Sequence, residues 1–160
     1  MIGAIADALI AVDPSNADEY RARADSYAGE IRALVEEFKA LAESAKRRTI
    51  VFGDRFPFRY FVDEFGLEYR AAFPGCHTQS DVSVATMAYL INFVSSEGIP
   101  VVYIIEFSNG NIARAIAEET GAEVLTLHST HNVTRAEFEA GVTYVDLMRQ
   151  NLENLRKGLY

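Results

Sequence analysis

Two of the three histidines of this chain lie close together, in the stretch AEVLTLHSTHNV at residues 122–133. His128 directly follows an alternating apolar run, and His131 comes a few positions later. The third histidine, His77, stands next to the only cysteine, Cys76, in the stretch FPGCHTQSD. Imidazole and thiolate are the ligands that a borderline-soft divalent ion such as zinc prefers. These residue types therefore indicate metal binding, provided that the fold brings them together.

The elements that position these side chains are short apolar runs that alternate with helical patterns. Four runs are short and rich in β-branched or aromatic residues, which predicts strands within residues 49–53, 68–73, 100–107 and 122–128. Helical spacing of apolar residues predicts helices over residues 58–65, 82–97, 111–120 and 144–155. Strands that alternate with helices predict an α/β fold, a four-stranded, mainly parallel sheet with helices on both faces.

The polar residues collect where the predicted strands end. In open parallel sheets, ligands bind outside the carboxyl ends of the strands. Polar side chains follow the first, second and fourth predicted strands. The third strand ends in the carboxylate of Glu106. We therefore expect one divalent ion, zinc in the first place, at this edge of the sheet. Its candidate ligands and supporting groups are His128, His77, Cys76, Glu106 and His131.

Each candidate also has an ordinary structural explanation. His128 taken alone suits a turn histidine, but the presence of His77 on the same edge favours a ligand. Cys76 is slightly better explained as a small buried side chain beside a Pro-Gly turn. Glu106 would be costly to bury unpaired, so we expect it to hydrogen-bond a ligand rather than to bind the ion. Three roles stay open for His131: it could bind the ion, donate a hydrogen bond to a ligand, or lie on the surface without a part in the site.

The amino-terminal part predicts helices without strands. Residues 3–11 have helical apolar spacing, and an Asp-Pro start signal precedes a second pattern that continues from Ala17 to Ala45. Such a helix is roughly 40 Å long by its rise per residue. We expect residues 1–46 to form an N-terminal helix and a long connector helix, and residues 47–160 to form the α/β lobe, as one structural domain overall.

Composition narrows the classes of protein. A chain of 160 residues with 49% hydrophobic residues suits a folded globular domain. A net charge of -8 argues against a nucleic-acid partner, which needs clustered Lys and Arg. No apolar run approaches the roughly 18 residues of a membrane span. The N-terminus lacks the basic start of a secretion signal, so we expect no signal segment in this chain.

Three segments resemble the second half of the metal-binding solute-binding proteins of ABC transporters. They are IADALIAVDPSNADEYRARADSYAGEI, RRTIVFGDRFPFRYFVDEFGLEY and ATMAYLINFVSSEGIPVVYIIEFSNGNIARAIAEETGAEVLTL. The resemblance implies uptake of zinc or manganese without catalysis, an ABC permease as partner, and an extracytoplasmic location, either periplasmic or as a cell-surface lipoprotein. Members have two α/β lobes joined by a long helix, with the ion between them, so this chain is similar to a carboxyl-terminal lobe with its connector.

The resemblance has two departures. The amino-terminal lobe, which in the family contributes two histidine ligands, has no counterpart here, so this lobe offers at most half of a closed site. Gly53 stands where the family commonly has a histidine or glutamate, and His77 could replace that ligand. The family's late aspartate corresponds to His128. We also expect a homodimer through the apolar side of the long helix. A surface that packs against another lobe in the family would be an exposed apolar patch in this lobe alone, and such patches favour association.

Two other functions fit the same residues. A small metal-dependent α/β hydrolase would use the ion to activate water, with Glu106 or Asp54 as general base. A scaffold without an ion would make the histidines incidental. For the ion itself, imidazole and thiol favour zinc, whereas oxygen-rich sites favour manganese.

Overall fold

The computed structural model describes residues 1–73 and 82–160. The chain divides into two compact units, Met1–Glu37 and Phe38–Tyr160. In the described parts of the chain, no helix is both long and apolar enough to cross a membrane.

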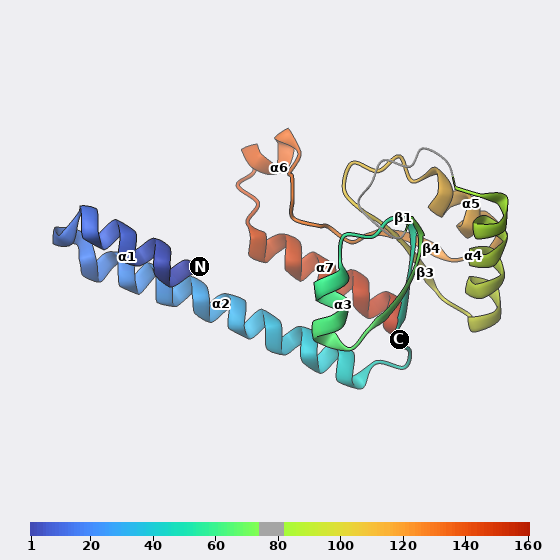
Figure 1. Cartoon of the computed structure of the whole chain (residues 1–160), viewed down its shortest axis with the longest axis horizontal. Coiled ribbons are helices and arrows are strands. Elements are labelled where there is room, and N and C mark those ends of the chain that lie inside the picture. Colours follow the sequence, from blue (N-terminus) through green and yellow to red (C-terminus); the bar gives the residue numbers. More distant parts are fainter. Residues whose placement is uncertain (74–81) are drawn as a thin grey trace. The chain divides into compact units, whose positions relative to one another are not determined.

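The first unit is a helical hairpin. Helix α1 (Ile2–Val12) is followed by a 3-10 turn (Pro14–Asn16) and by the first part of α2 (Ala17–Ser44), which runs back antiparallel to α1 (Figure 1). The carboxylate of Asp13 closes the turn, because it accepts hydrogen bonds from the Ser15 hydroxyl at 2.6 Å and the Tyr20 hydroxyl at 3.0 Å. The 28 residues of α2 confirm the long helix expected from the sequence.

The second unit is built on a sheet of four parallel strands in the order β2-β1-β3-β4. The strands are β1 (Thr49–Arg55), β2 (Glu68–Phe73), β3 (Val101–Ile104) and β4 (Glu123–Thr126). Five consecutive residues of β1 are buried, as expected for a parallel strand that is covered on both faces. The sheet confirms the predicted fold class.

Helices cover both faces of the sheet (Figure 1). On one face, α4 (Val84–Glu97) and α5 (Asn111–Thr120) contact each other and the strands. On the other face, α7 (Tyr144–Leu159) contacts β1, β3 and β4, and α3 (Arg59–Phe65) contacts β2. Alternate residues of a strand point to opposite faces. Val102 of β3 thus joins the apolar cluster under α4 and α5, whereas the hydroxyl of Tyr103 reaches the carbonyl of Asn154 in α7 at 3.0 Å.

The third and fourth strands are shorter than the sequence predicts. They end at Ile104 and Thr126, although the amide of Leu127 still donates to the carbonyl of Ile104 at 2.8 Å. The chain turns away after β3 because Phe107 has a left-handed backbone, with φ of 58°. Glu106 and His128 therefore lie in the loops just beyond the strands, which are the loops that form the carboxyl edge of the sheet.

A short helix, α6 (Arg135–Glu139), lies between β4 and α7. Its first turn carries a capping box formed by Thr134 and Glu137. The Thr134 hydroxyl accepts from the amide of Glu137 at 3.1 Å, and the Glu137 carboxylate accepts from the amide of Thr134 at 2.7 Å. This cap fixes where the loop after β4 ends and the helical connection to α7 begins.

Candidate metal site

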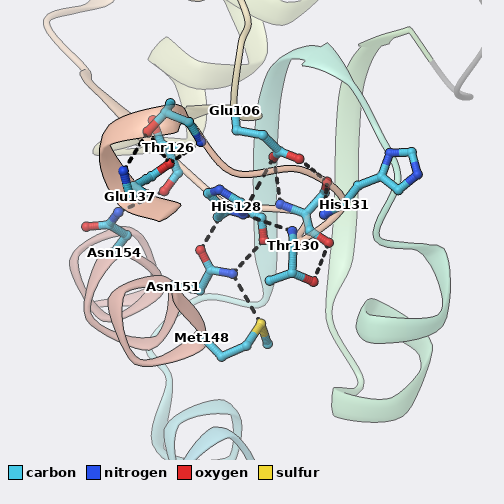
Figure 2. Close-up of polar contacts among 11 residues, drawn as sticks. Glu106, Thr126, His128, Thr130, His131, Glu137, Met148, Asn151 and Asn154 are labelled. Atoms are coloured by element: carbon cyan, nitrogen blue, oxygen red, sulfur yellow. Dashed lines mark hydrogen bonds and ion pairs between the residues drawn. The ribbon is translucent and has the colours of Figure 1, made fainter. Parts of the chain in front are cut away.

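The backbone of His128 is held by α7. The Asn151 side chain accepts a hydrogen bond from the amide of His128 at 2.7 Å and donates one to its carbonyl at 2.8 Å (Figure 2). One turn further on, the side chain of Asn154 donates to the carbonyl of Thr126 at 2.7 Å. Two amide side chains on one face of α7 thus fix the chain as it leaves β4, and they fix the starting point of the imidazole.

The imidazole of His128 is buried, with 7% of the side chain exposed. Its Nδ1 accepts a hydrogen bond from the amide of Thr130 at 2.9 Å. Its Nε2 is buried and has no hydrogen-bond partner among residues 1–73 and 82–160. A buried polar atom without a partner costs free energy. Among the described residues, Nε2 of His128 and Oδ2 of Asp54 are the two buried side-chain atoms without a hydrogen-bond partner.

Glu106 lies beside this imidazole, with its Oε2 4.0 Å from Nδ1 of His128. Its carboxylate accepts hydrogen bonds from the amide of Ser129, at 2.8 Å, and from the Ser129 hydroxyl. Burial raises the pKa of Glu106, but the two donors of Ser129 outweigh this effect, and the pKa lies below its ordinary value. A partly buried carboxylate that is ionised at neutral pH therefore lies beside the ring of His128.

A hollow of about 410 Å³ opens at the same edge. It lies where the loops after β1, β3 and β4 meet, which is the position that the parallel sheet predicts for a ligand. Glu106 and His131 both line it, and His131 is exposed with its ring pointing away from His128 (Figure 2). The lining residues are Arg55, Pro57, Phe58, Ile105, Glu106, Phe107, Ser129, His131 and Asn132.

The structure thus brings together two of the five predicted site residues, His128 and Glu106. It places His131 on the same edge with its ring turned away from His128. Cys76 and His77 lie outside the described residues. Within residues 1–73 and 82–160, no three or more His, Cys, Asp or Glu side chains gather closely enough to hold a metal ion. The described residues therefore supply part of a site.

Gly53 is closed off by helix α5. A Cβ at this position would lie 2.6 Å from the Cβ of Ala113, far inside contact distance. No histidine or glutamate fits there while α5 lies so close to β1. The neighbouring Asp54 is buried, and its Oδ1 accepts from the amide of Arg55 at 2.7 Å. Asp54 is not among the residues that line the hollow, so its position gives no support to a role as general base there.

Asn151 is the residue that sequence reasoning missed. It occupies the middle of a row along α7 with Leu147 and Leu155, spaced by four residues, and all three are buried. A polar residue in an apolar row at helical spacing signals a buried hydrogen-bonding group, because such groups are nearly always paired. The sequence carries this signal, but it does not show which atoms the amide contacts.

A parallel α/β lobe with its polar groups at the carboxyl edge, entered through a long helix, has the architecture of one lobe of a solute-binding protein. The comparison with protein families makes this class specific. The chain belongs to the ZnuA family, described as the periplasmic component A of the zinc-uptake complex, whose family model matches residues 1–158. The resemblance found in the sequence is thereby confirmed.

The curated relatives are longer than this chain. The high-affinity zinc uptake system protein ZnuA of Bacillus subtilis is 24% identical over 151 residues, which cover 94% of this chain and 47% of that protein. The zinc-binding protein AdcA of Streptococcus pyogenes is 28% identical over 152 residues, which cover 95% of this chain and 29% of that protein. The chain therefore spans about half or less of the length of these relatives.

A solved structure shows the same fold. The metal-dependent lipoprotein YcdH of Bacillus subtilis superposes with a TM-score of 0.81 at 24% identity, and the match covers 98% of this chain and 58% of that one. The family is a metal-binding transport component, and neither it nor these relatives supports the hydrolase alternative.

Proposed function

We propose that this chain binds a divalent metal ion, zinc in the first place, as the carboxyl-terminal lobe of a zinc-uptake solute-binding protein. The observation that carries the proposal is the buried, unpartnered Nε2 of His128 at the carboxyl edge of the sheet. Imidazole nitrogen is a preferred zinc ligand. The names of the relatives support zinc as the cargo, since they describe zinc uptake and zinc binding.

The five predicted residues take different parts in this proposal. His128 binds the ion through Nε2. The carboxylate of Glu106, which lies 4.0 Å from Nδ1, orients the ring. Cys76 and His77 follow β2 in the sequence and are proposed as further ligands because of their thiol and imidazole side chains. His131 lines the hollow beside Glu106 and is proposed as a ligand at its mouth. A site with thiolate and several imidazoles favours zinc over manganese.

The setting of the protein is also a proposal. The family description, a periplasmic component of a zinc-uptake complex, supports an extracytoplasmic location. We propose that the chain is periplasmic or held at the cell surface, and that it delivers the ion to an ABC permease. Binding for transport needs no catalytic base, so we propose that the chain is not an enzyme. Catalytic turnover of ester or phosphate substrates that depends on zinc and is lost in Glu106→Gln would contradict this.

We further propose that the chain associates with a second copy through its helical hairpin. A hollow of about 380 Å³ lies between α1 and α2 within the first unit, and its lining is mostly apolar, with Ile5 55% exposed and Leu9 46% exposed. Exposed apolar patches favour association. A dimer is expected in size-exclusion chromatography, and a monomer at high protein concentration would contradict it.

Calorimetric titration with zinc chloride tests the binding function. We expect saturable binding by the wild-type chain and a large loss of affinity in His128→Ala. Zinc at about one hundred times the dissociation constant should also raise the free energy of unfolding by about 2.7 kcal/mol. Identical thermal unfolding with zinc and with a chelator would contradict the proposal.

Single substitutions of the other candidates rank their contributions. Cys76→Ser, His77→Ala and His131→Ala should each weaken zinc binding if the residue is a ligand. Thr120→Ala, on the distant helix α5, serves as a control that leaves the affinity unchanged. A wild-type affinity in His77→Ala and Cys76→Ser together would remove both residues from the site.

A further inference from the structure

The hollow at the carboxyl edge of the sheet is larger than a metal ion needs. Its volume of about 410 Å³ lies within the range of roughly 300–1,000 Å³ that is typical of sites for small organic molecules. A water molecule occupies about 30 Å³ in the liquid, so an ion with a few waters would fill only part of the hollow. The hollow therefore has room for an organic molecule beside the ion.

A guanidinium group lines this hollow. It belongs to Arg55, the last residue of β1, whose side chain is 40% exposed. Among the described residues, only the carboxylate of Asp54 lies within ion-pair distance, with its Oδ1 3.8 Å from Nε of Arg55. The two terminal nitrogens of Arg55 make no hydrogen bond to residues 1–73 and 82–160. These two nitrogens form a fork that matches the two oxygens of a carboxylate.

The positive charge of Arg55 is unfavourable for a bare metal ion. Like charges repel, and a divalent ion carries two of them. The carboxylate of Glu106 lines the same hollow, but it accepts hydrogen bonds from the amide and the hydroxyl of Ser129 and forms no ion pair with Arg55. A cargo that brings its own carboxylate replaces the repulsion by an attraction.

Part of the wall of the hollow is apolar. The apolar residues that line it are Pro57, Phe58, Ile105 and Phe107. Phe107 is 64% exposed, and its φ of 58° is unusual for a bulky side chain. Residues held in such a conformation cluster at ligand sites. A bare ion gains nothing from an apolar wall, whereas the ring of an organic ligand packs against one.

We infer that zinc enters this site as a complex with a small organic chelator that carries a carboxylate and a planar ring. This inference rests on the proposed function and names its cargo more closely. Arg55 binds the carboxylate through its two terminal nitrogens, and Phe107 packs against the ring. The chelator keeps its bonds to zinc while His128 adds a ligand from the protein, since zinc usually takes four ligands.

L-Histidine is a suitable probe, because it combines a carboxylate, a planar ring and nitrogen ligands for zinc. Equilibrium dialysis of the chain against radiolabelled L-histidine, with and without zinc chloride, measures how much label the protein retains. We expect stoichiometric retention with zinc and none without it. Zinc binding from zinc chloride without retention of the label would overturn the inference while the proposed function stands. Retention without zinc would also overturn it. If the chain binds zinc in neither form, the proposed function fails and the inference fails with it.

Arg55→Gln distinguishes the bare ion from the complex by the direction of the change. Loss of the repulsive charge should strengthen the binding of zinc chloride by about twofold, whereas loss of the fork should weaken the retention of L-histidine by about tenfold. A general disturbance of the fold would weaken both. The control Arg156→Gln removes the same charge from the last turn of α7 and should change neither. Changes in the same direction in Arg55→Gln, or wild-type retention of the label, would overturn the inference.

Phe107→Asn tests the apolar wall. Asparagine tolerates the left-handed backbone better than most residues, so the variant removes the ring without adding strain. Retention of L-histidine in the presence of zinc should fall by about threefold, because the contact between the two rings is lost. Phe138→Asn is the control, since Phe138 is an exposed phenylalanine of α6 that does not line the hollow. Wild-type retention in Phe107→Asn, or an equal loss in the control, would overturn the inference.

Discussion

The Asn151 side chain is bound to both backbone groups of His128, to the amide at 2.7 Å and to the carbonyl at 2.8 Å. Asn151 lies in α7 and His128 in the loop after β4, so this pair joins the last helix of the fold to the candidate ligand. An amide side chain is suited to this, because it can accept from one backbone group and donate to the other. The position of the imidazole thus depends on how α7 packs on the sheet.

Replacement of Asn151 by leucine should weaken both folding and zinc binding. Asn151→Leu leaves a buried N–H and a buried C=O without their partners, and each such loss costs about 1–3 kcal/mol. We expect a lower free energy of unfolding in urea and a weaker affinity in zinc titration. Gln150→Leu is the matched control, since Gln150 is exposed on the same helix. Equal stabilities of the two variants would show that the amide contacts contribute nothing.

The close approach of α5 to β1 predicts a strong effect at Gly53. In Gly53→Ala the new methyl group would lie 2.6 Å from the Cβ of Ala113, so the helix must shift. Overpacking of this kind costs about 1–3 kcal/mol. Gly29→Ala, in α2, meets no atom within 4 Å and should be neutral or stabilising by up to about 1 kcal/mol. Thermal unfolding of both variants measures the difference, and a stable Gly53→Ala would mean that α5 lies further from the strand.

The packing of β3 against α7 predicts a coupling between Tyr103 and Gly158. A Cβ at position 158 would overlap the buried hydroxyl of Tyr103, which donates to the carbonyl of Asn154 at 3.0 Å. Gly158→Ala should therefore lower the free energy of unfolding, and Tyr103→Phe in the same chain should recover part of the loss. A double-mutant cycle measures this coupling. Additive effects of the two substitutions would contradict the contact.

Much of the fold follows from local pattern. The runs at residues 49–53 and 68–73 are short, apolar and bounded by turns, and they form β1 and β2. The carboxyl edge could also be located, since it depends only on the strands being parallel. For the same reason the sequence places Glu106 and His128 at one edge, and the structure confirms that they are neighbours.

The finer geometry of the site could not be predicted, because it depends on contacts between distant segments. The hydrogen bond from the Thr130 amide to Nδ1 of His128 depends on a left-handed turn at a threonine, which local preference disfavours. The lack of room for a side chain at Gly53 depends on how closely α5 packs against β1. The spacing of residues along the chain encodes neither the contact of the Thr130 amide with the imidazole nor the distance between α5 and β1.

The start of α7 predicts a pH effect. The amide and hydroxyl of Thr143 donate to the Asp146 carboxylate at 2.9 and 2.6 Å, and these bonds hold the pKa of Asp146 below its ordinary value of 3.8. Because the pKa is lower in the folded chain than in the unfolded chain, the interaction stabilises the fold above the unfolded pKa, and this contribution is lost as pH falls through the folded pKa. Thr143→Ala removes the hydroxyl donor, so the pKa of Asp146 should rise towards its ordinary value.

The measurement for Thr143→Ala is acid unfolding followed by circular dichroism, with the Asp146 carboxyl titrated by NMR. The variant should be less stable than the wild type at neutral pH, and the difference should shrink as the pH falls below the ordinary pKa of Asp146, because protonation removes the same interaction from the wild type. In the control Thr120→Ala, the lost hydroxyl donates to the carbonyl of Ile116 at 2.7 Å, so its effect on stability should not depend on pH in this range. A Thr143→Ala difference that stays constant down to acid pH would place the stabilisation in the backbone cap alone, without the carboxylate.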